Sequence, residues 1–195
     1  MSVELLDSMG TDLTVVNAAR VSYAKESAEF SGRDGKLIAF LMREGHGSPF
    51  EHCVFSFRIT APLFIARQWM RTRMASYNER SGRWTEFDEE FYLPGPDIDP
   101  DQEVDEHSQL CFAKYQDLLA KGWSKENARM VLPLNLLTMF WWTVNARSLM
   151  NFLAQRSASD AQHQIQEYAG QVEKFFANRM PVSHAAFNEY GRKAP

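Results

Sequence analysis

Hydrophobic and polar positions alternate most clearly between residues 53 and 60. Cys53, Phe55, Phe57 and Ile59 are apolar, whereas most of the residues between them are polar, so the segment is predicted to be a strand with one buried face. Cys53 lies on the apolar side, which favours a core residue over a nucleophile. A second, shorter strand is predicted over residues 87–93.

Helical patterns dominate the remainder of the chain. They predict helices over residues 14–23, 34–44, 62–73, 101–120, 125–132, 134–156, 160–178 and 184–190. Asp34, Ser124 and Ser159 are candidate N-terminal capping residues, Pro62 suits a first helical position, and Gly45 a helix end. Residues 45–52 and 77–84 are predicted loops, and residues 94–100 a break. We therefore expect a helix-rich α+β fold with a small antiparallel or mixed sheet, as a single domain over residues 1–195.

Composition narrows the class of protein. The chain has 195 residues, 45% of them hydrophobic, which is enough for a substantial core. Two cysteines and no Cys-x-x-Cys pair fit a reducing cytoplasm. The N-terminus does not resemble a secretory signal, and the most apolar stretch, residues 131–144, is too short and polar to span a membrane. A net charge of −4 argues against a general nucleic-acid binder.

Arginines concentrate in one part of this acidic chain. Residues 58–83 contain six arginines, no lysine and a single acid, Glu79. Guanidinium groups recognise phosphate or carboxylate in a bidentate manner that lysine cannot match. Trp69 and Tyr77 are interleaved with them, and Ser81-Gly82-Arg83 has the composition of an anion-binding turn. The pattern predicts an anion site; the alternative is a solvated helix face followed by a loop.

Polar residues also interrupt the apolar segment 134–156. In a helix, Asn145 and Arg156 would share one face, and Arg147 and Asn151 another. Arginines on such an apolar helix need partners, either internal ion or amide bonds or contacts with two ligands or other subunits. Arg129 precedes another apolar run and, taken alone, is typical of a structural cap or surface charge.

The sequence shows no motif for a zinc site, for a hydrolase serine or for a glycine-rich nucleotide-binding loop. The segment from His46 to His52 contains two histidines and Glu51 but matches no zinc motif, so no metal is predicted. Gly-x-Ser-x-Gly, Gly-x-Gly-x-x-Gly and Walker A patterns are absent from the sequence. The residues alone thus indicate nucleotide or phosphate binding without specifying a reaction.

Arg71-Thr72-Arg73, followed after seven residues by Ser81, resembles the Arg-His-Arg-x7-Ser signature of flavin-dependent thymidylate synthases. Segments 51–57, 66–69, 128–133 and 145–152 resemble further blocks of that family in the same order. The resemblance implies reductive methylation of dUMP to dTMP, with methylenetetrahydrofolate as carbon donor and FAD reduced by NADPH. It also implies a homotetramer whose active sites are built from several subunits.

Residue roles follow from the matched positions. The residues implied to hold dUMP are Gln68, Trp69, Met70, Arg71, Glu79, Arg80, Ser81, Gly82, Arg83, Arg129 and Arg156. Those implied to line FAD are Ser48, Arg71, Thr72, Arg73, Glu79, Asn145, Ala146, Arg147 and Asn151, with His46 near flavin and folate. Arg156 is the implied catalytic residue, because a fixed positive charge favours the ionised uracil. Ser81 is not assigned as a nucleophile, since no activating base is placed for it.

Thr72 departs from the signature, which has histidine at this position. We expect FAD to bind nonetheless, because the flanking arginines and the later asparagines remain. The sequence leaves two alternatives open. One is a non-catalytic nucleotide- or flavin-binding homologue impaired at Thr72, and the other is an RNA- or DNA-binding domain that uses the arginines.

Overall fold

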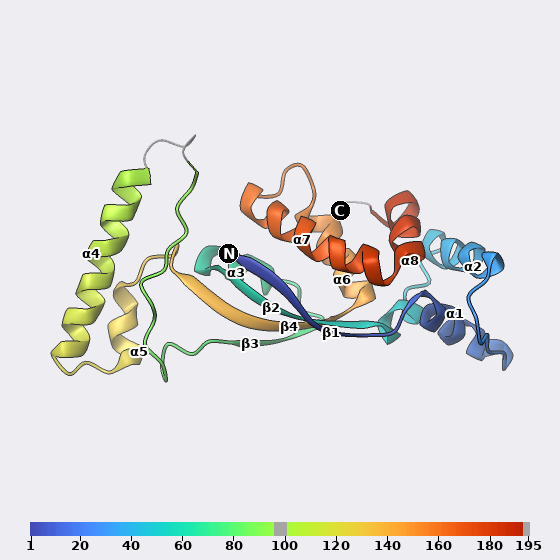
Figure 1. Cartoon of the computed structure of the whole chain (residues 1–195), viewed down its shortest axis with the longest axis horizontal. Coiled ribbons are helices and arrows are strands. Elements are labelled where there is room, and N and C mark those ends of the chain that lie inside the picture. The colour runs from blue at the N-terminus through green and yellow to red at the C-terminus, as the bar shows by residue number, and fades with distance from the viewer. Residues whose placement is uncertain (96–100, 193–195) are drawn as a thin grey trace. The chain divides into compact units, whose positions relative to one another are not determined.

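The structure, a computed structural model, describes residues 1–95 and 101–192 (Figure 1). Its strands are β1 (Ser2–Met9), β2 (Val54–Pro62), β3 (Ala75–Glu79) and β4 (Leu137–Asn145), which form an antiparallel sheet in the order β1-β2-β4-β3. The α-helices are α1 (Asp12–Arg20), α2 (Gly32–Arg43), α3 (Leu63–Trp69), α4 (Asp101–Ala120), α5 (Lys125–Ala128), α6 (Ala146–Arg156), α7 (His163–Arg179) and α8 (Pro181–Ala186). The predicted helix-rich α+β class is confirmed.

Shorter helical turns complete the secondary structure. Three are 3-10 helices, η1 (Val21–Tyr23), η2 (Ser48–His52) and η3 (Arg129–Val131), and η4 (Phe187–Gly191) is a π-helix. The chain forms two compact units. The α7 unit comprises residues 3–58, 72–77 and 142–195, and the α4 unit comprises residues 1–2, 59–71 and 78–141. The prediction of a single domain stays a prediction.

The core of the α7 unit lies between the sheet and helices α6 and α7, which cover one face of the strands (Figure 1). Phe55 of β2 meets Phe176 of α7 edge-on, with ring centroids 6.1 Å apart, and Trp142 of β4 lies 5.0 Å from Phe152 of α6. Cys53 is fully buried, and burial raises the pKa of its thiol to about 11. The predicted core role of Cys53 is therefore confirmed.

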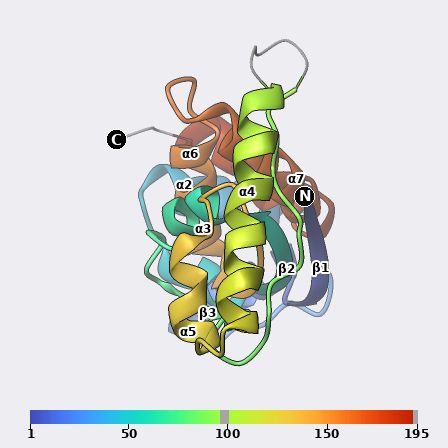
Figure 2. The same ribbon diagram turned by 90° about the vertical axis from the view of Figure 1, so that its left-hand side faces the viewer.

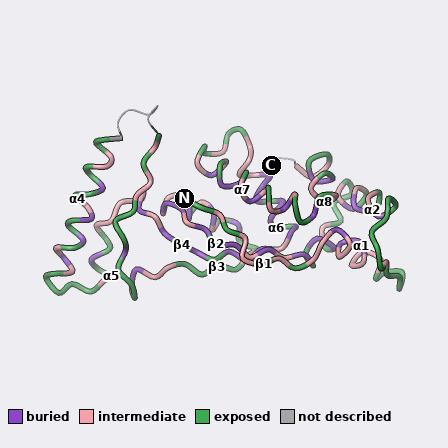
Figure 3. The backbone as a smooth tube through the Cα atoms, viewed as in Figure 1, coloured by how far each residue is buried: buried purple, intermediate pink, exposed green. Residues whose placement is uncertain are grey.

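The α4 unit has its own apolar cluster. Helices α4 and α5 lie side by side (Figures 1 and 2). The cluster consists of Phe87, Phe112, Tyr115, Leu118, Ala128 and Leu136. Figure 3 shows that buried positions on α4 recur among exposed ones at helical spacing. An amphipathic helix of this kind gains its stability from the apolar side that it buries.

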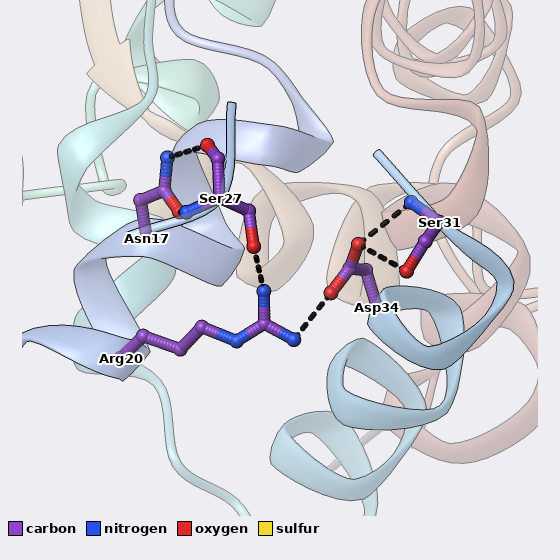
Figure 4. A network of polar contacts seen from close by, with 5 residues as sticks. All are labelled: Asn17, Arg20, Ser27, Ser31 and Asp34. Atoms are coloured by element: carbon purple, nitrogen blue, oxygen red, sulfur yellow. Dashed lines mark hydrogen bonds and ion pairs between the residues drawn. The ribbon is translucent and has the colours of Figure 1, made fainter. Parts of the chain in front are cut away.

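A polar network ties α1 to α2 (Figure 4). Asn17 exchanges two hydrogen bonds with the Ser27 backbone, and Arg20 bonds the Ser27 hydroxyl. The guanidinium of Arg20 lies 2.5 Å from Asp34, which in turn accepts from the backbone N–H and the hydroxyl of Ser31. Ser31 is the N-terminal cap of α2 and Asp34 the third residue of its capping box, so Asp34 contributes to the cap as predicted.

The two ends of the α7 unit meet at a buried carboxylate. Asp12, 6% exposed, accepts hydrogen bonds from the Val182 and Ser183 N–H groups at 3.0 and 2.8 Å and from the Ser183 hydroxyl at 2.6 Å. These are the first N–H groups of α8, which have no partners within the helix. A residue near the start of the chain thus caps a helix near its end.

The largest error of the sequence prediction concerns residues 134–156. They do not form one helix, because strand β4 occupies Leu137–Asn145 and only Ala146–Arg156 is helical. The burial of Phe140, Trp142 and Val144 alternates with the exposure of Met139 and Trp141, which is the period of a strand. Helices do not therefore account for everything after residue 100.

Other predicted elements also need correction. Residues 75–79 form strand β3, although a loop was predicted from residue 77. The predicted strand 87–93 is reduced to one bridge between Phe91 and Leu136. Strand β1 was not predicted, η1 lies at the end of the predicted helix 14–23, and η2 lies in a predicted loop. Helix α3 ends at Trp69 rather than residue 73, with Pro62 as its cap, and α7 begins after Gln162, so Ser159 is not its cap.

Several boundaries agree closely with the sequence. Helix α4 has the predicted bounds, Ser124 occupies the N-cap position of α5, and Gly45 follows the end of α2 with a φ of 71°. The predicted helix 125–132 divides into α5 and η3, and the predicted turn 184–190 falls on α8 and η4. Of the predicted break at 94–100, residues 96–100 lie outside the described residues.

Candidate functional site

The signature segment leaves helix α3 at Met70 and reaches strand β3 five residues later. Arg71 and Arg73 are exposed, whereas Thr72 between them is buried, with 7% of its surface accessible. The Tyr77 hydroxyl donates a 2.9 Å hydrogen bond to the Thr72 backbone carbonyl. This bond fixes the peptide between the two arginines, so that residue 72 points inward and its neighbours outward.

Tyr77 is a neutral hydrogen-bond donor at physiological pH. Burial raises the pKa of the Tyr77 hydroxyl to about 12. Three weaker effects lower this pKa: a hydrogen bond with Trp142, the bond to Thr72 and the positive charge of Arg156. The surroundings of Tyr77 therefore include the guanidinium of Arg156, at the last turn of α6. Within the α7 unit, the structure thus brings Arg156 near the tyrosine that holds the signature segment.

Residues 81–85 form the turn that their composition predicted. The Ser81 carbonyl accepts from the Trp84 and Thr85 N–H groups, each at 3.0 Å, and the Ser81 hydroxyl accepts from the Arg83 N–H at 3.3 Å. Gly82 is buried here, and a Cβ on it would lie 2.8 Å from Phe87 Cζ and 3.2 Å from Arg129 Cδ. Only glycine allows the turn to approach the buried Phe87 ring this closely.

Two predicted arginines from distant segments converge on Glu126 of α5. Arg83 Nε lies 2.8 Å from the Glu126 carboxylate, and Arg129 Nε donates to the Glu126 backbone carbonyl at 3.3 Å. Both arginines are exposed, and Arg83 also lies over the ring of Trp84, with its Cζ 5.2 Å from the centroid. The α4 unit therefore gathers Ser81, Gly82, Arg83 and Arg129 into one cationic surface, named below the arginine cluster.

The remaining predicted residues of the α4 unit differ in accessibility. Glu79 is exposed and accepts a 2.8 Å hydrogen bond from the buried Thr138 hydroxyl. Arg80 pairs with Asp88 at 2.7 Å, and its side chain is 29% exposed, against 61% for Arg83, so Arg80 is less available to a ligand. Trp69 is fully buried against Phe140, and Gln68 and Met70 are partly buried at the end of α3.

A cavity of about 370 Å³ lies within the α7 unit. Its lining includes three residues predicted to contact flavin or folate: His46, Arg147 and Asn151. Arg147 and Asn151 lie one turn apart on α6 and share a face, as predicted. The volume falls within the range of small-molecule and cofactor pockets in proteins.

The loop that forms one side of the cavity is held in place by its backbone. The His46 N–H bonds the Leu41 carbonyl at 2.8 Å, and the Phe50 N–H bonds the Gly47 carbonyl at 3.1 Å. Gly47 lies against Arg147, since a Cβ would come within 2.5 Å of Arg147 Nε. Arg147 also pairs with Glu51 at 2.6 Å, and Ser48 begins the η2 turn beside it.

Two predicted flavin-binding residues have structural roles in the described residues. Asn145 caps helix α6, because its side-chain oxygen accepts from the Ser148 N–H at 2.9 Å. Ala146 is fully buried, and its N–H bonds the Cys53 carbonyl at 2.8 Å, which joins the start of α6 to the end of η2. Together these bonds place Arg147 and Asn151 at the cavity.

Several residues of these surfaces were missed by the sequence analysis. Arg43, Phe187 and Tyr190 line the cavity, and Glu126 and Thr138 hold predicted site residues. Only the short spacing of Glu126 and Arg129 gave a local signal. Among residues 1–95 and 101–192, no group of three His, Cys, Asp or Glu side chains is arranged to hold a metal ion. Within the same ranges, no helix has the length and apolar character needed to cross a membrane.

Comparison with known proteins places this arrangement in a family. The model of the family described as thymidylate synthase complementing protein, Thy1, matches residues 4–182. The chain belongs to the Thy1 family. Two relatives of this Thy1 chain are named flavin-dependent thymidylate synthase. The protein from Thermotoga neapolitana is 48% identical over 98% of this chain and 92% of its own length, and that from Kosmotoga olearia is 42% identical over 95% and 89%. The resemblance inferred from the signature is thereby confirmed.

Solved structures agree with this Thy1 assignment. The UMP/dUMP methylase PolB from Streptomyces cacaoi, bound with 5-Br dUMP, superposes with a TM-score of 0.93 at 37% identity and covers 100% of this chain and 97% of that one. The same methylase bound with 5-Br UMP gives a TM-score of 0.89 and covers 100% and 96%. The Thy1 fold of this chain is thus shared over its whole length with a nucleotide methylase.

Proposed function

We propose that this chain is a flavin-dependent thymidylate synthase, which converts dUMP to dTMP by reductive methylation. Methylenetetrahydrofolate provides the carbon, and bound FAD, reduced by NADPH, provides the hydride. The observation that carries the proposal is the near full-length match, at 48% identity, to a relative of that name. A binder without activity is not favoured, because the relatives named as enzymes match along nearly the whole chain.

The arginine cluster supports binding of a nucleotide phosphate. Arg83 and Arg129 present two exposed guanidinium groups beside the turn at Ser81 and Gly82, and guanidinium groups suit phosphate oxygens. A phosphate dianion would compete with the Glu126 carboxylate for Arg83. Because that ion pair is exposed, with 61% and 44% of the two side chains accessible, its loss costs at most about 1 kcal/mol.

The cavity of the α7 unit supports binding of part of FAD. Arg147 and Asn151 supply polar donors. Because Gly47 has no Cβ, the Arg147 side chain can lie directly against its backbone. The residues present therefore fit a group that combines flat rings with carbonyl and phosphate oxygens. The roles inferred by resemblance for Ser48, Arg71, Thr72, Arg73 and Arg156 remain part of the proposal.

The reaction is tested by tritium release from dUMP labelled at position 5, in the presence of methylenetetrahydrofolate and NADPH. Release together with dTMP formation is the expected result, and a chain that binds FAD but releases no tritium would contradict the proposal. The matched PolB structures are described as a UMP/dUMP methylase, so UMP labelled at position 5 is the control substrate. We expect faster release from dUMP than from UMP.

We further propose a homotetramer in the cytoplasm. The exposed Met139 and Trp141 side chains on β4, at 43% and 55% accessibility, support burial against another subunit. Two free cysteines support a reducing compartment. Sedimentation velocity of the purified protein tests the assembly, and a monomer at micromolar concentration would contradict it. Fluorescent tagging in the native cell tests the location.

A further inference from the structure

The C-terminal π-helix η4 forms one wall of the cavity in the α7 unit. Phe187, Tyr190 and Gly191 of η4 line it together with the end of α2, including Met42 and Arg43. Gly191 lies so close to α2 that a Cβ would come within 2.8 Å of Met42 Sδ. In Figure 1 these C-terminal turns lie beside α2, far from it in sequence. π-Helical turns are rare and occur frequently at functional sites.

The π-helix η4 and the residue after it pack against α7. The buried ring of Phe187 lies 6.4 Å from that of Phe176 in α7, and Arg192 Cζ lies 4.6 Å from the Phe187 centroid. Arg192 is also ion-paired with Glu173, which bonds His184 at 2.7 Å. These contacts join η4 to α7 and α8, so Tyr190 is presented to the cavity by a packed segment.

The cavity lining combines aromatic rings and sulfur atoms with polar donors at its rim. Aromatic rings come from Phe50, Phe187 and Tyr190, and sulfur atoms from Met42 and Met150. Arg43, Arg147 and Asn151 add donors at the rim. Rings and thioethers pack against flat conjugated surfaces, and guanidinium and amide groups bond ring carbonyls. The lining therefore suits a planar heteroaromatic ring that carries oxygen or nitrogen acceptors.

Tyr190 is a protonated donor at neutral pH. A hydrogen bond with Glu189 raises the pKa of its hydroxyl, burial adds to the rise, and Arg43 opposes it. The hydroxyl has a single proton, so it can donate to an acceptor on a ring by exchanging its bond with Glu189, while its own aromatic face packs against that ring. Arg43 pairs with Glu44 at 2.9 Å on an exposed surface, a weak pair that a ligand can replace.

We propose that Tyr190 and Arg43 are cofactor-binding residues, which contact a planar ring of FAD in the cavity together with Arg147 and Asn151. The inference rests on the proposed function and extends it. The C-terminal segment then takes part directly in flavin binding, and no sequence motif near the signature would reveal it. Removal of the Tyr190 ring is expected to weaken FAD binding about tenfold, and removal of its hydroxyl alone about threefold.

The test is titration of flavin-free protein with FAD, followed by quenching of flavin fluorescence. Tyr190→Ala, Tyr190→Phe and Arg43→Gln are compared with wild type and with Tyr23→Ala, a control at a tyrosine that is 77% exposed on η1. Parallel titrations with FMN and with ADP show which ring occupies the cavity, since only the matching fragment loses affinity in the variants. Tyr190→Phe keeps the packed ring, so it remains informative if Tyr190→Ala does not fold.

We expect the three cavity variants to bind FAD more weakly and to bind dUMP as wild type does, with Tyr23→Ala unchanged. Wild-type FAD affinity in Tyr190→Phe, Arg43→Gln and a folded Tyr190→Ala overturns this inference and leaves the proposed function intact. A wild-type chain that binds dUMP but no FAD overturns both. An equal loss in the Tyr23→Ala control also overturns the inference, because the effect then does not come from the cavity.

Discussion

Substitution of Gly47 by alanine isolates the role of the cavity from the stability of the fold. Gly47 has a φ of −79°, which alanine adopts freely, so the backbone accepts the change. The added Cβ, however, lies 2.5 Å from Arg147 Nε, 2.8 Å from its Cδ and 2.9 Å from its Cζ. Ordinary contacts begin at 3.4 Å, so the Arg147 side chain must move by about 1 Å or change rotamer.

The two expected energies differ enough to be separated. The pair between Arg147 and Glu51 is exposed, at 57% and 42%, so its loss lowers the free energy of unfolding by less than about 1 kcal/mol. A hydrogen bond from Arg147 to a bound cofactor is worth about 1.5–3 kcal/mol, because one partner is charged. FAD affinity is therefore expected to fall about tenfold or more, while stability hardly changes.

The assay measures both quantities on the same preparations. FAD titration by fluorescence gives the Kd, and urea denaturation of the flavin-free protein gives the free energy of unfolding. Gly170→Ala is the matched control, because its Cβ meets nothing within 4 Å and it lies inside α7. That variant is expected to gain about 0.5–1 kcal/mol of stability at unchanged FAD affinity. An unchanged Kd in Gly47→Ala would refute the placement of Arg147 at the cofactor.

Three further predictions concern other parts of the molecule. Gly82→Ala is expected to lose about 1–3 kcal/mol of stability by overpacking against Phe87 and to bind dUMP more weakly, as calorimetry would show; wild-type behaviour in both would contradict the turn geometry. Arg156→Ala is expected to lose dTMP formation but retain FAD, so near-normal turnover would remove this guanidinium from the mechanism. Hydrogen bonding from Ser31 lowers the pKa of Asp34, so its contribution to stability is present above the unfolded pKa of about 4 and is lost as pH falls through the folded value. Asp34→Asn is therefore expected to be less stable than wild type at neutral pH, with the gap closing below about pH 4 in urea denaturation, and a pH-independent gap would contradict the assignment.

The sequence predicted elements well where one face of a segment was polar. Residues 53–60 alternate openly and form β2, and α4 has its predicted bounds. Strand β4 was misread because both of its faces are apolar: Met139 and Trp141 are exposed, whereas Phe140 and Trp142 are buried. Periodicity cannot separate a strand from a helix when both patterns are filled with large apolar residues.

Some residues of the candidate site were predictable from the sequence, and others were not. The composition of residues 81–83 predicted the turn, because Ser and Gly act through local backbone geometry. Resemblance supplied Arg147 and Asn151, which the cavity brings together. Tyr190 left no local signal, since its place at the cavity depends on the packing of the chain's last helices against α2. Contacts of this kind are a property of the folded chain.

The carboxylate of Asp12 has a consequence for when the protein becomes able to take up its cofactor. It caps α8 through Val182 and Ser183, which lie 170 and 171 positions after Asp12 in the chain. The π-helix η4 follows directly from α8. During translation the capping carboxylate has no helix to cap until the 170 residues that follow Asp12, up to Val182, have been made. The cavity wall that contains Tyr190 is thus made after every other element that lines the cavity, so flavin is expected to bind only once this wall has been made.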